Sequence, residues 1–241
     1  MLFLKAANGS IIHALNYSAT WYQNELKKEG GWSLEMIDTK NPCSSSNNWK
    51  ASTNPDGGTP GIKNSVDALN ADQIAPQLKN AFTNDNTTII LVFDEPLDSL
   101  SGTISSNYSI DGGISFTSAE PLSPLFNRVR LKTNNPLLAI AVYNITVNNI
   151  TDCKGNAIGS ANKTKTGLAV DAAAGDGVVN EILFNPRSNA NDYVEFYNKS
   201  DKILDASKLY IANRNSSGVI SSIHSRSEEH TSELQSQNRI S

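Results

Sequence analysis

Apolar and polar residues alternate with a period of two along most of the chain after residue 87. The run at residues 87–93 is β-branched and apolar, and it ends in an Asp-Glu-Pro turn. Short runs of the same kind follow at intervals of about 8 to 12 residues, at residues 108–110, 114–116, 128–131 and 142–147. This pattern predicts an all-β fold with a β-sandwich. We expect its core to receive Ile90, Val92, Tyr143, Ile145 and Val147.

Composition changes mark two linkers, residues 65–73 and 171–177, which are rich in Ala, Asn, Asp and Gly. They divide the chain into a first unit (residues 1–64), a middle unit (residues 74–170) and a third unit (residues 178–225). The 241 residues suffice for more than one modest core. We therefore expect several β-domains in series.

The middle unit resembles the bacterial Ig-like domains of surface-layer and other secreted proteins. The matching features are Ile-Ile-Leu-Val-Phe at 89–93 followed by Asp-Glu-Pro, the strand at 143–147, and an Asp-x-x-Gly-Asn turn that begins at Asp152. Gly155 permits a positive φ in that turn, and the side-chain amide of Asn156 can hold it. The resemblance implies an Ig-like β-sandwich.

The first and third units resemble the two halves of a lamin-tail domain. Four motifs of the first unit occur in the family's order and indicate a C-terminal half; they are IIHALNY at 11–17, GGWSLE at 30–35, NWKAS at 48–52 and GGTPG at 57–61. Residues 178–186, 192–198 and 209–213 indicate an N-terminal half. Each half would expose an unpaired sheet edge and an apolar face, so residues 178–213 could in principle pair with residues 2–37.

Residues 226–241 differ from the rest of the chain. Their RSEEHTSELQS segment has no apolar period and looks like the translation of a sequencing-adapter oligonucleotide. We expect a non-native tail that is either disordered or adventitiously placed.

Composition narrows the class of protein. Hydrophobic residues make up 38% and charged residues 18%, the net charge is -4, and the basic residues form no stripe. The chain therefore lacks the basic surface with which proteins usually bind the phosphates of nucleic acids. It also has no apolar run that is long enough to span a bilayer. The apolar stretch in residues 1–5 is too short for the core of a signal peptide. We expect a piece of a secreted or cell-surface protein whose signal peptide lies upstream.

The sequence shows no combination of nucleophile and base that would indicate an enzyme, so we predict none. His13 lies among apolar neighbours and favours a structural role. Calcium is the one cofactor that the residues would admit. Its weak candidate ligands are Glu181, Asp192 and Glu195, with a second acidic group at Asp94, Glu95 and Asp98. In both groups we favour carboxylates that are solvated or accept backbone N–H bonds.

Aromatic and sulfur-containing residues leave two alternatives open. Trp21, Trp32 and Trp49 suit packing in the first unit better than stacking on a sugar ring. Cys43 and Cys153 are the two cysteines. Because they fall in different units, a bridge would have to cross an interface, and idle thiols are the simpler expectation.

These observations predict a non-catalytic structural, spacer or adhesion segment of an exported bacterial surface protein. Its partners would be the neighbouring domains of the same chain and surface glycans or proteins. The alternative is an accessory module, binding glycan or calcium, of an extracellular hydrolase or nuclease.

Overall fold

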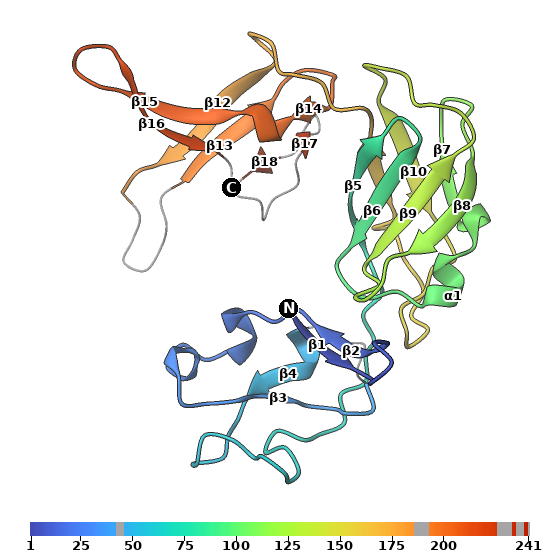
Figure 1. Ribbon diagram of the computed structural model, residues 1–241, viewed down its shortest axis with the longest axis vertical. Coiled ribbons are helices and arrows are strands. Elements are labelled where there is room, and N and C mark those ends of the chain that lie inside the picture. Colours follow the sequence, from blue (N-terminus) through green and yellow to red (C-terminus); the bar gives the residue numbers. More distant parts are fainter. Residues whose placement is uncertain (42–45, 186–192, 226–232, 235–238, 241) are drawn as a thin grey trace.

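The computed structural model describes residues 1–41, 46–185, 193–225, 233–234 and 239–240, with side chains as far as residue 221. Strands dominate these residues (Figure 1). The helical segments among them are one short α-helix, α1 (Ser99–Gly102), and five 3₁₀ turns. The prediction of an all-β fold is confirmed.

The middle unit, hereafter the sandwich, contains seven strands in two antiparallel sheets (Figure 1). The strands are β5 (Leu78–Asp85), β6 (Thr88–Phe93), β7 (Tyr108–Ile110), β8 (Phe116–Pro121), β9 (Arg128–Thr133), β10 (Tyr143–Val147) and β11 (Lys163–Thr166). One sheet has the order β5-β6-β9-β8 and the other β11-β10-β7. This is the strand order of a constant-type Ig domain, so the predicted Ig-like sandwich is confirmed.

The core lies between these two sheets. It includes Tyr143, Ile145 and Val147, as predicted, but on β6 it contains Ile89, Leu91 and Phe93. The prediction for β6 was therefore wrong by one residue. Because nearly every position of β6 is apolar, its own alternation does not identify the inner face. The pairing does, since β6 lies against β9, where Val129 and Leu131 alternate with basic residues.

A tyrosine fixes the connection between the two sheets. Tyr143 begins β10, and its hydroxyl accepts a 2.9 Å hydrogen bond from the Leu138 N–H five residues upstream. Ig domains place a tyrosine in this way where the chain passes from one sheet to the other. Gly112, at φ 72°, lies against the ring, because a Cβ there would stand 2.7 Å from Tyr143 Cε1. The corner therefore requires both the phenol and the glycine.

The first unit consists of short strands and turns. Its elements are β1 (Leu2–Lys5), β2 (Ile11–Leu15), η1 (Ala19–Tyr22), η2 (Lys27–Glu29), β3 (Leu34–Met36), η3 (Ser46–Asn48) and β4 (Trp49–Ala51). β1 pairs with β2, and β3 pairs with β4. The strand motifs that suggested a lamin-tail half thus form β2, β3 and β4, while membership of that family stays a prediction.

The third unit contains β12 (Gly177–Leu183), β13 (Tyr193–Asn198), β14 (Leu204–Asp205), η5 (Ala206–Lys208), β15 (Tyr210–Arg214) and β16 (Ile220–Ser225). β12 pairs with β13, and β15 with β16. Two short strands in the terminal segment, β17 (Glu233–Leu234) and β18 (Arg239–Ile240), pair with β14 and β13. These four residues therefore pair with strands of the third unit, and both an adventitious placement and a non-native origin of the segment stay predictions.

Both terminal units expose apolar side chains on their strands. Leu2, Leu4 and Ile12 in the first unit and Val179 and Ile182 in the third are more than half exposed. The strand pairings of the described residues do not join the two units, which lie apart in Figure 1. The pairing considered between residues 2–37 and 178–213 is therefore absent from the described part of the chain.

Candidate metal centre

The Asp-x-x-Gly-Asn turn positions the first functional carboxylate, that of Asp152. Gly155 adopts a φ of 92°, as expected. Asp152 Oδ1 accepts the N–H groups of Lys154 and Asn156 at 2.8 and 2.9 Å, and its Oδ2 accepts the Asn156 amide at 2.7 Å. The role expected of Asn156 is thus confirmed. These bonds hold Asp152 in one orientation while it is only 2% exposed.

Glu95 lies two residues after the end of β6. It is 9% exposed, and its Oε1 is buried without a hydrogen-bond partner. Buried carboxylate oxygens almost always have a donor. Glu95 is therefore the unusual member of the site.

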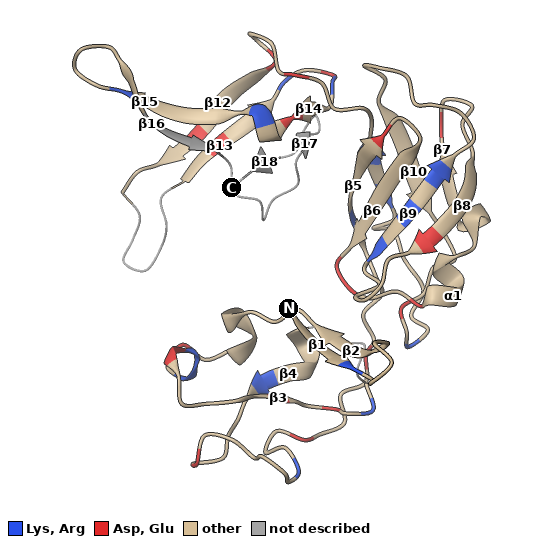
Figure 2. Ribbon diagram, viewed as in Figure 1, with Lys and Arg blue, Asp and Glu red and all other residues tan. Residues whose placement is uncertain are grey.

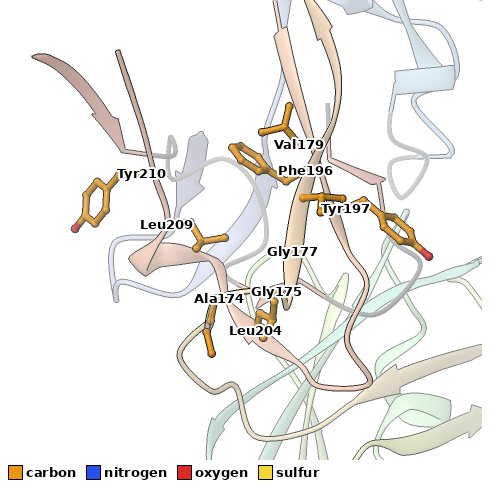
Figure 3. A pocket seen from close by; sticks show the side chains of 12 residues that line it. Ala174, Gly175, Gly177, Val179, Phe196, Tyr197, Leu204, Leu209 and Tyr210 are labelled. Atoms are coloured by element: carbon orange, nitrogen blue, oxygen red, sulfur yellow. The ribbon is translucent and has the colours of Figure 1, made fainter. Parts of the chain in front are cut away.

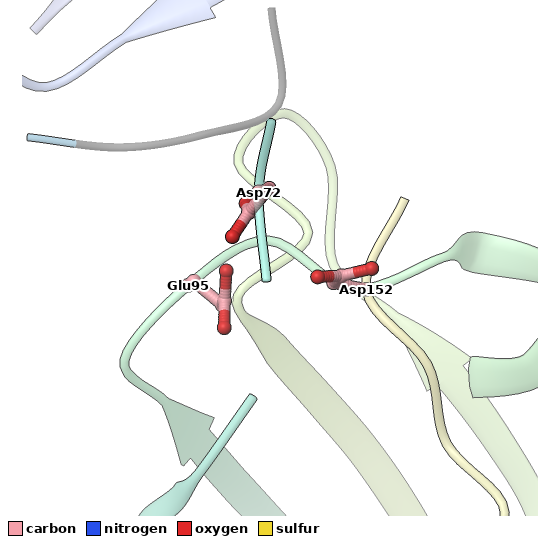
Figure 4. Close-up of side chains that lie close together, drawn as sticks. All are labelled: Asp72, Glu95 and Asp152. Carbon is pink, nitrogen blue, oxygen red and sulfur yellow. The ribbon is translucent and has the colours of Figure 1, made fainter. Parts of the chain in front are cut away.

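Asp72 comes from the linker that precedes the sandwich. Carboxylate oxygens of Asp72, Glu95 and Asp152 all lie within 4.8 Å of one another, and Figure 4 shows the three side chains converging. The Asn156 amide also donates to the Asp72 carbonyl at 3.2 Å, which holds the linker against the turn. We call these three residues the carboxylate cluster.

Three full negative charges in the carboxylate cluster would repel one another, so ionisation of all three residues is unfavourable. Burial raises the pKa of the Glu95 carboxyl to about 7, with further contributions from Asp72, Asp152 and Asp94. Positive groups nearby have other partners: Lys79 forms an ion pair with Asp94, and the Lys154 ammonium donates to the Lys40 carbonyl at 2.8 Å. A shared proton or a bound cation would reduce the repulsion among these three carboxylates.

Of the acidic residues considered at positions 94, 95 and 98, the structure brings only Glu95 into the cluster. Asp94 Oδ1 accepts the Gln77 N–H at 2.8 Å. Asp98 caps α1 by accepting the Leu100 and Ser101 N–H groups. Acceptance of backbone N–H bonds, the role that we favoured, is correct for Asp94 and Asp98.

The other calcium candidates from the sequence form a different arrangement. Glu181 and Glu195 lie opposite each other on β12 and β13, whereas Asp192 lies outside the described residues. Glu181 accepts the Tyr193 hydroxyl and Glu195 accepts the Asn180 amide, each at 2.6 Å. Calcium at this position stays the alternative that the sequence did not favour.

Sequence reasoning missed Asp72 and the role of Asp152. Glu95 and Asp152 stand in the two motifs that carry the Ig-like resemblance, and both motifs follow core strands that end at the same pole. The Ig-like resemblance could therefore have suggested that Glu95 and Asp152 are neighbours, although no local pattern of residues does. Asp72 belongs to a linker that shows no strand or turn pattern in the sequence. Only the path of the folded chain shows that it lies beside Glu95 and Asp152.

The tryptophans pack, as expected. Trp21 and Trp49 lie with ring centroids 6.3 Å apart, and Lys27 Nζ stands 3.9 Å above the Trp32 ring. His13 is half-buried on β2 and lines a hollow of about 550 Å³ against the loop between β8 and β9. Stacking of these tryptophans on a sugar ring stays the alternative that the sequence did not favour.

An apolar hollow of about 340 Å³ lies in the third unit (Figure 3). It is bordered by residues 172–175 and by side chains of β12, β13 and β15, among them Val179 and Phe196. None of the described side chains that line it is charged, so it offers a surface for packing.

Cys153 is in a disulfide, so the simpler expectation of an idle thiol is wrong for this residue. Cys43 lies outside the described residues.

Figure 2 shows lysine and arginine distributed over all three units. In the part of the chain that the structure describes, no helix is long and apolar enough to cross a membrane.

Fold and site together define an all-β protein with an acidic cluster at the point where the chain enters an Ig-like sandwich. No protein-family model matches the chain, and no curated protein does. Among solved structures, the chain is similar to the N-terminal part of the bacterial S-layer protein SbsC, at 17% identity over 62% of this chain and 33% of that one, with a TM-score of 0.37.

Two further structures show the same partial likeness. The S-layer protein rSbsC matches at 18% identity over 61% of this chain and 19% of that one, with a TM-score of 0.36. SbsC domains 1–6 match at 16% identity over 61% and 22%, with a TM-score of 0.37. The chain thus spans a third or less of the length of these structures.

Proposed function

We propose that the chain is a non-catalytic structural segment of an exported bacterial surface protein, in which the sandwich spaces its neighbours. The observation that carries this proposal is that the neighbouring units attach at opposite ends of the sandwich (Figure 1). β5 spans the distance between those ends. Its eight residues, at about 3.3 Å each, separate them by about 25 Å.

The entry pole is the end at which the linker meets the sandwich. Leu78, the first residue of β5, donates its N–H to the Ala161 carbonyl at 2.8 Å. The Asn156 amide contacts the linker at Asp72, and Lys154 contacts the first unit at Lys40. Polar contacts therefore fix the direction in which the chain enters.

The exit pole is the end at which the third unit begins. Thr83, near the end of β5, donates its hydroxyl to the Gly167 carbonyl at 3.1 Å. Val170 forms a parallel bridge with Leu204, and Leu204 is only 1% exposed. The third unit is thus joined to the sandwich by buried contacts as well as by the chain.

Two observations support export. Disulfides persist mainly in oxidising compartments, and Cys153 is in one. A surface solvated largely by neutral polar side chains fits the same setting, because only 18% of the residues are charged.

The test of spacing is whether the units tumble together. We expect ¹⁵N relaxation of the full chain to give one rotational correlation time for amides of β6 and of β13. A variant with a Gly-Ser insertion after Val170 is the matched control and should give two correlation times. Independent tumbling in the unmodified chain would contradict the proposal.

The alternative, an accessory module of an extracellular hydrolase or nuclease, differs in what the parent chain contains. The full-length reading frame distinguishes the two, because a catalytic domain beside these units would favour the accessory role.

A further inference from the structure

We propose that the carboxylate cluster of Asp72, Glu95 and Asp152 binds a Ca²⁺ ion that ties the linker to the entry pole of the sandwich. This inference does not depend on the proposed spacing function. It assigns a ligand to a site, whereas the spacing function concerns the arrangement of the units.

The unpartnered oxygen of Glu95 is the observation that points to a ligand. Glu95 is more than nine-tenths buried, and its carboxylate is directed toward the other two (Figure 4). Oε1 has no donor within the described protein. A buried carboxylate oxygen without a donor costs free energy unless another group binds it. A cation at the centre of the cluster would bind the Glu95 carboxylate and so provide the partner that the protein does not.

The geometry suits a calcium ion. Ca²⁺ takes oxygen ligands at about 2.3–2.6 Å, so two ligands on opposite sides of one ion lie about 5 Å apart. The three carboxylate oxygens lie within 4.8 Å of one another, so all three can reach one ion without large movement. Mg²⁺ binds at about 2.1 Å in strict octahedral geometry and fits a spread of this size less well.

The ligand types also select the ion. All three donors are carboxylate oxygens, which hard cations prefer, and the cluster contains no histidine or cysteine that would favour zinc. Asp152 is already oriented by donors from its own turn. Asp72 is oriented as well, because its Oδ1 accepts the Ile74 N–H at 3.1 Å. Glu95 is therefore the ligand that would gain a partner from the ion.

The three ligands come from separate segments of the chain. Asp72 belongs to the linker, Glu95 follows β6, and Asp152 lies in the turn between β10 and β11. Without a cation, their mutual repulsion opposes docking of the linker. With a cation, the same charges hold it in place, so we infer that calcium sets the rigidity of the first junction.

The first experiment is calorimetric titration of the chelator-treated full chain with CaCl₂ at pH 7.5. We expect one site with a Kd of about 0.1–1 mM, the range of extracellular calcium modules. At 10 mM Ca²⁺ the melting temperature should rise by about 5 °C.

Two isosteric variants locate the site. Asp72→Asn and Glu95→Gln should each weaken calcium binding at least tenfold and remove the calcium-dependent rise in melting temperature. Their matched controls are Asp67→Asn, in the same linker, and Glu120→Gln, on β8; both lie outside the cluster and should bind calcium like the unmodified chain. Without calcium, both cluster variants should melt no lower than the unmodified chain, because each removes a repelling charge.

A second readout follows the linker itself. Leu69 is 92% exposed and stands three residues before Asp72. Calcium should slow chymotrypsin cleavage after Leu69 at least fivefold in the unmodified chain and leave the rate unchanged in Asp72→Asn.

Three outcomes would overturn the calcium site: no binding or stabilisation at 10 mM Ca²⁺, binding that persists in both cluster variants, or stability that responds to pH between 6 and 8 but not to calcium. The last result would mean that Glu95 holds a proton instead.

Discussion

Ser65 donates both its backbone N–H and its hydroxyl to one carboxylate oxygen of Glu35, each over 2.7 Å. The Thr59 hydroxyl donates to the other oxygen at 2.6 Å. Burial by itself would raise the pKa of this 4% exposed carboxyl, but these donors and Ser52 outweigh it and lower the pKa to about 2. An ionised glutamate thus holds β3, the loop at Thr59 and the linker together.

The first prediction concerns acid stability of the first unit. The folded pKa of Glu35 lies below its ordinary value of 4.5, so its contribution is complete above about pH 4.5 and is lost as the pH falls toward 2. All three tryptophans belong to this unit, so tryptophan fluorescence during urea unfolding reports its stability. We expect a loss between pH 4.5 and 2 that is smaller in Glu35→Gln.

At pH 7, Glu35→Gln should cost about 2 kcal/mol, because it removes charge-assisted hydrogen bonds in a buried site. Glu29→Gln, at an exposed position, is the control. Equal pH dependence in Glu35→Gln and the unmodified chain would contradict the assignment.

The second prediction tests the inner face of β6. Leu91→Asp should abolish slow amide exchange across β6 and β9, because an unpaired charge would enter the core. Val92→Asp, on the other face and half-buried, should retain it. The reverse result would mean that the alternation of β6 has the phase first expected from the sequence.

The third prediction concerns the tyrosine corner. Tyr143→Phe removes the acceptor of the Leu138 N–H and should destabilise the sandwich by about 1 kcal/mol. Gly112→Ala should cost at least as much, since its φ is positive and the added Cβ meets the ring. Urea unfolding followed by amide signals of β10 measures both, with Tyr17→Phe as an exposed control; unchanged midpoints would refute the role.

The fourth prediction addresses the exit pole. A Cβ at Gly167 would collide with the Ala141 carbonyl and press on Ile203 Cγ1 at 3.2 Å. Gly167→Ala should therefore loosen the third unit at a cost of about 1–3 kcal/mol. Faster amide exchange at Val170 and Asp205 would show it, whereas Gly159→Ala, in open space, should have no effect.

Much of the sandwich was predictable because its strands are separated by strong turn residues. β7 matches the predicted residues, and β6, β9 and β10 differ at their ends. The strand predicted at 114–116 was mostly wrong, because only Phe116 belongs to β8. β5 and β11 were missed, and the sequence of β11, Lys-Thr-Lys-Thr, shows why. An edge strand with one shielded face needs little apolar content, so its pattern does not differ from that of a polar loop.

The candidate site was predictable only in part, because a site at a junction depends on long-range pairing. Glu95 was considered for its neighbours in sequence, Asp94 and Asp98, yet its neighbours in space come from the linker and from the turn after β10. The packing of the two sheets brings Glu95 and Asp152 to one pole. The local pattern of residues does not show that Glu95 and Asp152 lie close together in space.

The parallel bridge at the exit pole has a mechanical consequence. Val170 donates its N–H to the Ile203 carbonyl at 2.9 Å and accepts the Asp205 N–H at 2.8 Å. Tension that entered from the sandwich and left beyond Asp205 would load both bonds together in shear, since the two segments run in the same direction. β12 and β13 lie in the chain between these points, so they would carry no load until both bonds parted.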